Sequence, residues 1–274
     1  MADLALTRLV LIGCGKMGGA MLRGWLSRGL QPAGALVVEP SEAALGDVAA
    51  PGLRRVASAA ALPPDFTPDV VVLAVKPQMM DDAIPAYRRF AQPGTLFLSI
   101  AAGKTIRYFQ RRLGAASAIV RAMPNTPAAI GRGISVAVAS KSVTPTQRSL
   151  ADSLLAACGE VAWIEDEALI DPVTALSGGG PAYVFLLMET LAEAGRKAGL
   201  PAELAMRLAR TTVSGAGELA RLSPDSAAEL RRNVTSPKGT TFEALNILMA
   251  PDGLQPLFDR AIAAATRRSR QLAG

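Results

Sequence analysis

The stretch LVLIGCGKMGGAM, Leu9 to Met21, decides the fold. Its leading apolar residues predict a short buried strand, and Gly13, Gly15 and Gly18 follow in the spacing G-x-G-x-x-G. In that spacing the first glycine permits a tight turn, the second lets the backbone approach a pyrophosphate, and the third lets helix and strand lie close together. A strand before the motif and a helix after it predict a dinucleotide-binding loop, with cofactor contacts from Gly13, Cys14, Gly15, Lys16, Met17 and Gly18.

Short apolar strands recur along the first part of the chain. They are predicted at residues 35–39, 70–75, 95–100, 118–123, 134–139 and 161–164, with helical segments between most of them. After Asp166 the strand pattern disappears and the remaining segments show helical periodicity. We therefore predict an α/β N-terminal domain of the Rossmann type with a doubly wound parallel sheet, residues 1–165, followed by an all-α domain, residues 166–274.

One segment of the helical half is apolar nearly all round. This is YVFLLMETLAEAGRKAGL, residues 183–200, in which the apolar residues dominate the first half. A helix of this kind is buried on all sides. The helical domain offers little to cover it, so we expect a partner subunit; burial between neighbouring helices of the same chain is the alternative.

The composition excludes several classes of protein. With no histidine and only Cys14 and Cys158, the chain has no metal-ligand cluster and no disulfide framework. Aromatic residues make up 4% and no basic run is interleaved with them, so we expect no nucleic-acid partner, whereas the net charge of +6 favours small anionic ligands. The charge-free span 172–188 is broken by SGGGP and cannot cross a bilayer as one helix. We expect no membrane partner and a reduced, cytoplasmic protein.

Polar residues follow several predicted strands, where ligands bind in doubly wound sheets. Glu39 ends the second strand, and an acid there can accept hydrogen bonds from the ribose hydroxyls of NAD and would repel a 2′-phosphate. No arginine follows directly, since the next residues are Pro40 and Ser41, so this strand end favours NADH. Glu39 could instead be a surface acid in a turn.

The segments AVKPQ, residues 74–78, and RAMPNTP, residues 121–127, also follow strands. Lys76 is placed to meet cofactor charge, and the prolines make both turns rigid. Both segments could alternatively be rigid connections with solvated polar tips. Further cofactor contacts are predicted from Glu39, Ser41, Ala74, Val75, Lys76, Pro77 and Asn125.

The stretch NVTSPKGTTFEAL, residues 233–245, gathers hydroxyl groups at one turn before a helix. Thr240 followed three residues later by Glu243 predicts a capping box and a helix start at residues 240–241. The free N–H groups of a helix start favour an anion, so this turn is a candidate anion site. An ordinary capped helix is the alternative.

Five motifs together resemble the pyrroline-5-carboxylate reductase family nearly end to end. They are IGCGKMGGAM, AVKPQ, RAMPNTP, DPVTALSGGGPAYVF and LRRNVTSPKGTTFEAL. The resemblance implies reduction of the cyclic imine 1-pyrroline-5-carboxylate to L-proline, the last step of proline biosynthesis, with NADPH or NADH as the cofactor. It also implies a helical dimerisation domain, a homodimer that can assemble into a pentamer of dimers, and a substrate cleft between the Rossmann domain and helices of a partner subunit.

The resemblance assigns the substrate to the hydroxyl-rich turn. It implies that the anion at this turn is the substrate carboxylate, that Ser236 and Thr241 are catalytic and face the substrate, and that the substrate is bound by Ser236, Gly239, Thr240, Thr241 and Asn125. Because an imine is readily protonated and then accepts hydride, we expect catalysis mostly by positioning, with the Thr241 hydroxyl bonded to the ring nitrogen as an orienting group or a minor proton relay. Two positions depart from the family pattern: Gly179 replaces a serine, and Lys238 stands where a glycine is common.

Two other functions remain open on the sequence. β-Hydroxyacid dehydrogenases share the GxGxMG start and a helical second half, but they carry a catalytic lysine on the first long helix of the second domain. Here residues 182–188 contain no lysine, and Lys197 lies at the far end of that helix. A non-enzymatic cofactor-binding or redox-sensing module is the second alternative, and imine-dependent oxidation of NADH or NADPH distinguishes it.

Overall fold

The chain forms two compact units in a computed structural model that describes residues 3–48 and 50–273. The units are Met1–Gly178 together with Ala265–Gly274, and Gly179–Ala264. The boundary between the two units therefore falls between Gly178 and Gly179, within the run SGGGP. The change from strands to helices falls earlier, after the last strand, near residue 166. The domain boundary at residue 165 stays a prediction.

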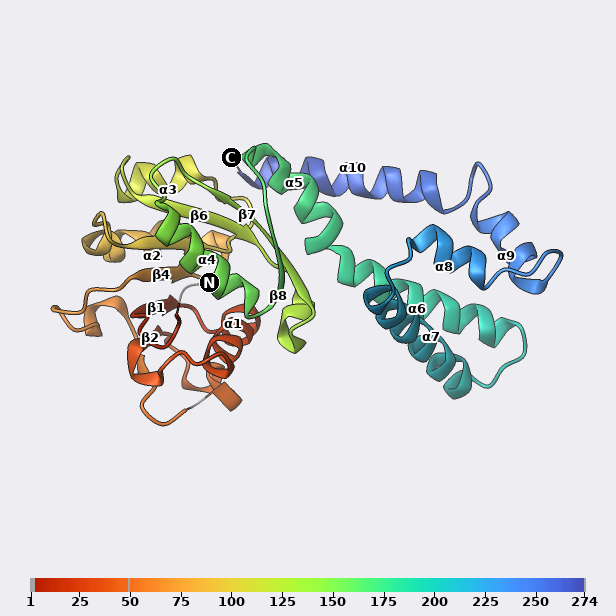
Figure 1. The fold of residues 1–274 in the computed structure, drawn as a ribbon, viewed down its shortest axis with the longest axis horizontal. Coiled ribbons are helices and arrows are strands. Elements are labelled where there is room, and N and C mark those ends of the chain that lie inside the picture. The colour runs from red at the N-terminus through yellow and green to blue at the C-terminus, as the bar shows by residue number, and fades with distance from the viewer. Residues whose placement is uncertain (1–2, 49, 274) are drawn as a thin grey trace. The chain divides into compact units, whose positions relative to one another are not determined.

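A single sheet forms the centre of the first unit. Its strands are β1 (Leu9–Ile12), β2 (Ala35–Val38), β3 (Arg54–Val56), β4 (Val70–Leu73), β5 (Leu96–Ser99), β6 (Ala118–Met123), β7 (Gly133–Ala139) and β8 (Gly159–Trp163). In the described part of the chain they are ordered β3-β2-β1-β4-β5-β6-β7-β8 (Figure 1). Strand order reverses between β1 and β4, and crevices at such switch points bind ligands in open α/β sheets. The predicted Rossmann-type sheet is thus confirmed.

Two features of the sheet differ from the prediction. β3 was not predicted, because it has only three residues, two of them arginines, and lacks an apolar run. β7 pairs antiparallel with β6, whereas all the other paired strands are parallel in the described residues. Residues 124–132 join β6 to β7, and a parallel crossover needs roughly a dozen or more residues. The short connection therefore explains the antiparallel pair.

Apolar strands buried on both faces explain the core. β1, β2, β4 and β5 are buried at every position, as expected where helices cover both sides of a parallel sheet. On one face Trp25 is fully buried and donates a hydrogen bond from Nε1 to the Leu154 carbonyl at 2.8 Å, which joins α1 to α4. The helices of this unit are α1 (Lys16–Ser27), α2 (Met80–Ala83), α3 (Ile106–Leu113), α4 (Pro145–Ala156) and α5 (Ile170–Val173).

Local sequence signals account for two of these helices. Thr144 and Gln147 form a capping box at the start of α4, with Pro145 in the first turn. By contrast, the segment after β4 is α-helical only at Met80–Ala83 and continues as a 3-10 helix at Ile84–Phe90. Pro85 lacks an N–H donor, so it cannot extend an α-helix from α2.

The second unit is helical and presents apolar side chains to solvent. Val184, Phe185, Leu186, Leu187 and Leu191 on α6 are all at least 42% exposed in the single chain. None of the helices in the described residues is both long enough and apolar enough to span a membrane. The helices of the second unit are α6 (Gly180–Lys197), α7 (Ala202–Leu222), α8 (Ala227–Asn233), α9 (Thr240–Leu248) and most of α10 (Leu254–Ala273). The last residues of α10 belong to the first unit.

Candidate active site

The glycine loop joins β1 to α1, and its three glycines meet different surroundings. Gly13 has a φ of +88°, a conformation that favours glycine. A Cβ at Gly18 would lie 2.3 Å from the Gly13 carbonyl oxygen, so helix and strand approach too closely for a side chain. A Cβ at Gly15 would meet no described heavy atom within 4 Å. The space over Gly15 is therefore open to a ligand.

The start of α1 offers hydrogen-bond donors beside that open space. Gly15 is the N-cap residue, and among the described residues no side chain caps this helix start. The Gly19 N–H donates to the Gly15 carbonyl at 2.8 Å, so intrahelical bonding begins one turn into the helix. The earlier N–H groups and the positive end of the helix dipole suit an anion. Loop and helix start together fit the pyrophosphate of a dinucleotide.

A cavity of about 600 Å³ lies at the carboxyl ends of β1, β2 and β4. Tyr87 forms part of its wall; burial raises the pKa of this phenol to about 12, so the hydroxyl stays neutral. Of the predicted cofactor residues, Gly13, Gly15, Glu39, Ala74, Val75 and Lys76 line it. The others do not line it among the described residues: Cys14, Lys16, Met17, Gly18, Ser41, Pro77 and Asn125.

Sequence reasoning missed one whole segment of the lining. Ala57, Ser58, Ala59 and Ala60 follow β3 and line the cavity. The three-residue strand that positions them carries no apolar run, so no sequence signal marked this turn.

Glu39 lies directly after β2, with its carboxylate held by the backbone on both sides. Oε2 accepts a hydrogen bond from the Cys14 N–H at 2.9 Å, and Oε1 accepts one from the Ser41 N–H at 3.0 Å. The side chain thus ties the glycine loop to the turn after β2. Each carboxylate oxygen can accept a further hydrogen bond. Glu39 therefore retains capacity for a ribose hydroxyl.

Asn125 follows β6 and its side chain already has one internal role. Its Oδ1 accepts a hydrogen bond from the Ile134 N–H at 3.0 Å, which fixes the orientation of the carboxamide. The amide nitrogen of an asparagine is a donor only, so it is the atom that could serve a ligand.

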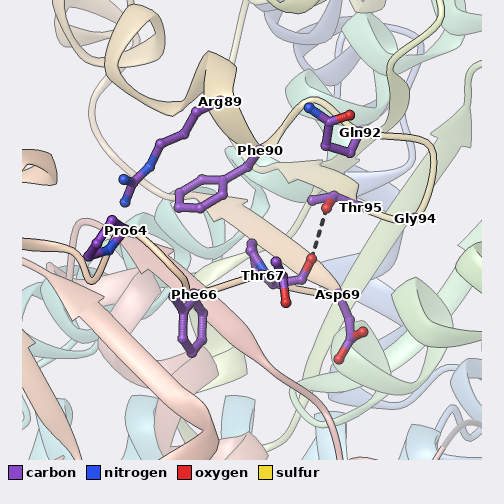
Figure 2. Close-up of a pocket in the computed structure, with 10 residues that line it drawn as sticks. Pro64, Phe66, Thr67, Asp69, Arg89, Phe90, Gln92, Gly94 and Thr95 are labelled. Carbon is purple, nitrogen blue, oxygen red and sulfur yellow. Dashed lines mark hydrogen bonds between the residues drawn. The ribbon is translucent and has the colours of Figure 1, made fainter.

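A second hollow, of about 350 Å³, lies at the amino ends of β4 and β5 (Figure 2). Two of its polar side chains are engaged within the protein: the Thr95 hydroxyl donates to the Pro68 carbonyl at 2.8 Å, and the Arg89 guanidinium lies over the Phe90 ring at 4.6 Å. Ligands of doubly wound sheets bind at the carboxyl ends of the strands. We therefore assign this hollow no role in the reaction.

The hydroxyl-rich turn precedes α9, but the predicted capping box is wrong. Gly239 is the N-cap residue, Thr240 is the first helical residue, and no described side chain caps the helix. The Glu243 N–H donates to the Gly239 carbonyl at 3.2 Å. The helix begins one residue earlier than a Thr240 cap requires, since Gly239 takes the extended N-cap conformation with φ −82° and ψ 174°. The first-turn N–H groups therefore lack the side-chain acceptor that a capping box would supply.

The turn before α9 holds Lys238 in a backbone conformation that is strained for a residue other than glycine. The Gly239 N–H donates to the Ser236 carbonyl at 3.0 Å across Pro237 and Lys238, and Lys238 has a φ of +58°. Proline in second place and a positive φ in third place are features of a type II turn, which favours glycine there. This explains why the family pattern has glycine at this position. Ser236 and Thr241 are both exposed at the two ends of the turn.

The run SGGGP also precedes a helix without a side-chain cap. α6 begins at Gly180, Pro181 lies in its first turn, and no described side chain caps it. Residues Thr174–Gly178 before it form a π-helix, in which the Ser177 hydroxyl donates to the Val173 carbonyl at 3.1 Å. Ser177 is thus engaged with the backbone, and Gly179 provides no hydroxyl in its place.

Relatives of known activity match the chain over nearly its full length. The chain is 40% identical over 267 residues to a pyrroline-5-carboxylate reductase of Pseudomonas aeruginosa, with 97% of each chain covered. It is 35% identical to the enzyme of the same name from Pisum sativum, which covers 96% of this chain and 95% of the relative. The chain belongs to the pyrroline-5-carboxylate reductase family. It is therefore an NAD(P)-dependent oxidoreductase with pyrroline-5-carboxylate reductase activity, in proline biosynthesis.

Family models and solved structures agree with this membership. A model described as "Pyrroline-5-carboxylate reductase dimerisation" matches residues 167–272, and one described as "NADP oxidoreductase coenzyme F420-dependent" matches residues 8–103. The pyrroline-5-carboxylate reductase of Coxiella burnetii superposes with a TM-score of 0.90 at 35% identity, covering 98% of this chain and 99% of that one. The Plasmodium falciparum enzyme, solved with NADP bound, gives 0.83 at 28% identity with the same coverage. The first unit thus carries an NADP-binding domain, and the helical part carries a dimerisation domain, which implies a homo-oligomer.

Both cysteines of this pyrroline-5-carboxylate reductase are buried and should be unreactive in the folded protein. Burial, followed by the charge of Glu39, raises the pKa of the Cys14 thiol, and burial raises that of Cys158 to about 11. The thiolate is the reactive form. We expect dithionitrobenzoate at pH 8 to label neither thiol in the native enzyme and both after unfolding in guanidinium. Rapid labelling of Cys14 in the native enzyme, located by peptide mass spectrometry, would show that the glycine loop opens.

Proposed function

We propose that the turn Ser236–Thr241 holds the carboxylate of 1-pyrroline-5-carboxylate and that Ser236 and Thr241 are the catalytic residues. The uncapped start of α9 carries this proposal, since its N–H groups have no described side-chain acceptor. The N–H groups of Thr240 and Thr241 and the Ser236 hydroxyl are the donors that would face the carboxylate, with Gly239 as the N-cap residue beside it. The helix dipole adds to the attraction. Asn125 is proposed to contribute its amide nitrogen to both substrate and cofactor.

The proton balance of the reaction suits a site without a strong acid. The imine takes up one proton to become an iminium ion, its ring carbon then accepts the hydride that the bound dinucleotide supplies, and the amine formed takes a second proton from solvent. The Thr241 hydroxyl can accept a hydrogen bond from the iminium N–H, which orients the ring and favours its protonated form. Holding the carboxylate and the nitrogen together fixes the ring in one orientation. Positioning is therefore the main contribution of these residues.

A direct test is binding of L-proline and of L-prolinamide to the enzyme. The two ligands differ in the charged group that the α9 start is proposed to hold, so proline should bind and prolinamide should bind at least about tenfold more weakly. The variant Ser236→Ala should narrow this difference. Equal binding of both ligands, or a crystal of the proline complex in which the turn is empty, would contradict the proposal.

For the cofactor, we propose that the glycine loop binds the pyrophosphate and that Glu39 favours NADH over NADPH. The contacts would come from Gly13, Cys14, Gly15, Lys16, Met17, Gly18, Glu39, Ser41, Ala74, Val75, Lys76 and Pro77. The support for Glu39 is its position directly after β2 in the lining of the large cavity, where the carboxylate can accept from ribose hydroxyls and repels a phosphate.

The variant Glu39→Ala is expected to raise the ratio of kcat/KM for NADPH to that for NADH by about tenfold, because one charge repulsion is lost. Glu39→Gln is the matched variant, since it removes the charge and keeps a hydrogen-bond acceptor for Cys14 or Ser41. Steady-state kinetics with both cofactors measure the ratio. An unchanged ratio in both variants would remove the role assigned to Glu39.

The assembly is proposed to be a homodimer, with a pentamer of dimers as the larger form. The exposed apolar residues of α6 support a subunit interface, since apolar side chains gathered on an exposed helix are typical of protein–protein contact sites. Sedimentation equilibrium distinguishes a dimer from a decamer. The cytoplasmic location stays a prediction.

A further inference from the structure

Arg55 of β3 lies against the turn that follows β2. Its Nη1 donates hydrogen bonds to the carbonyl oxygens of Glu39 at 2.9 Å and of Pro40 at 3.3 Å. The parallel pairing of β2 and β3 produces this placement, because Val37 and Arg55 are register partners and the Glu39 N–H continues the ladder to the Val56 carbonyl. An arginine distant in sequence thus reaches the strand end where none follows in the chain.

The Nη2 group of this guanidinium forms no hydrogen bond within the described chain. Its Nη2 lies 3.9 Å from Oε2 of Glu42, which is beyond hydrogen-bond distance, and within the described chain Nη2 forms no closer polar contact. The Arg55 side chain is 27% exposed, whereas the Glu42 side chain is 90% exposed. An ion pair this open contributes little. Glu42 can therefore turn away, leaving the Nη2 donors free for another acceptor.

Two hollows are lined by residues that these hydrogen bonds join. Glu39 and Pro40 line the cofactor cavity, whereas Arg55 and Glu42 line a hollow of about 340 Å³. Since Arg55 is bonded to the carbonyls of Glu39 and Pro40, its guanidinium stands immediately beyond the cavity wall. A substituent that extends outward from a ribose held at Glu39 would reach the hollow lined by Arg55 and Glu42. It would meet the positive charge of Arg55 there, beside the exposed Glu42 carboxylate.

We propose that Arg55 is the specificity-determining residue that binds the 2′-phosphate of NADPH, with Glu42 as the group that the phosphate displaces. This inference rests on the cofactor placement proposed above. Arginine suits the role because its planar fork can bond two carbonyls on one edge and a phosphate on the other. Glu39 and Arg55 then act in opposite directions at one strand end, with Glu39 disfavouring the 2′-phosphate and Arg55 binding it. The chain can accordingly use both NADH and NADPH.

The test compares binding of 2′,5′-ADP with binding of ADP, measured by isothermal titration calorimetry on the full-length enzyme. These probes share the adenine, ribose and 5′-phosphate side, and differ in the 2′-phosphate and the second 5′-phosphate. Arg55→Met should weaken 2′,5′-ADP binding about 10- to 50-fold and change ADP binding less than about threefold. Glu42→Gln should strengthen 2′,5′-ADP binding. Arg55→Lys should keep part of the affinity through its charge.

Arg54→Met is the matched control, since Arg54 is the exposed neighbour on the same strand and should leave both probes unaffected. If Arg55→Met weakens both probes equally, Arg55 only supports the turn and the inference is overturned. No effect on either probe overturns it as well. Failure of the wild-type enzyme to bind either probe would instead refute the cofactor placement on which the inference rests. The kcat/KM ratio for NADPH over NADH should follow the same order of variants.

Discussion

Gly15→Ala is expected to fold like the parent enzyme and to bind NADH and NADPH about 100-fold more weakly, because the added methyl group blocks the close approach of a pyrophosphate to the backbone. The added Cβ would meet no described atom within 4 Å, so the protein accommodates it. Gly15 also has φ −68° and ψ −164°, which alanine can adopt. The methyl group occupies only space reserved for the ligand.

Thermal unfolding and cofactor titration separate this outcome from damage to the fold. Gly18→Ala serves as the contrast, because its Cβ would lie 2.3 Å from the Gly13 carbonyl oxygen and should lower the free energy of unfolding by about 3 kcal/mol. An unchanged melting temperature with weak cofactor binding is the expected result for Gly15→Ala. Normal cofactor affinity in Gly15→Ala would show that the pyrophosphate does not approach the loop.

Features set by local sequence could be predicted before the structure. The glycine loop and the buried strands depend on neighbouring residues, so periodicity and spacing were sufficient. The antiparallel β7 depends on the length of the connection before it, and β3 depends on pairing with β2. Neither feature leaves a local pattern, because both arise from chain connectivity and strand pairing.

In the candidate site, too, the residues that follow a predicted strand could be placed from the sequence, whereas contacts between distant segments could not. Glu39 could be placed from its strand, but its bonds to Cys14 and Ser41 require the three-dimensional path of the loop. Arg55 could not be placed, since it reaches the same turn from a strand that the sequence did not reveal. At α9 the motif predicted the helix start correctly but the N-cap residue wrongly. Gly239 and Thr240 are both residue types that can precede a helix, and the backbone turn at Lys238 places Gly239 in the N-cap position.

Thr241→Val should lower kcat/KM for pyrroline-5-carboxylate about 20-fold, since it removes one hydrogen bond to a charged group and keeps the shape of the side chain. Thr241 is the second residue of α9 and is exposed, so a β-branched replacement should leave the helix intact. Thr241→Ser keeps the hydroxyl and should retain most of the activity. Steady-state kinetics at saturating cofactor measure both variants.

The pH profile tests the role of Thr241 beyond simple packing. A hydrogen bond to the iminium N–H stabilises the charged form and so raises the pKa of the bound iminium. Without that bond the pKa of the bound iminium is lower, so in Thr241→Val the fall of kcat with rising pH, measured at saturating substrate, should begin at a lower pH than in the parent enzyme. Thr241→Ser should keep the parent profile. If Thr241→Val loses activity equally at every pH, the hydroxyl orients the ring without favouring its protonated form; if it loses none, the α9 start does not hold the reacting nitrogen at Thr241.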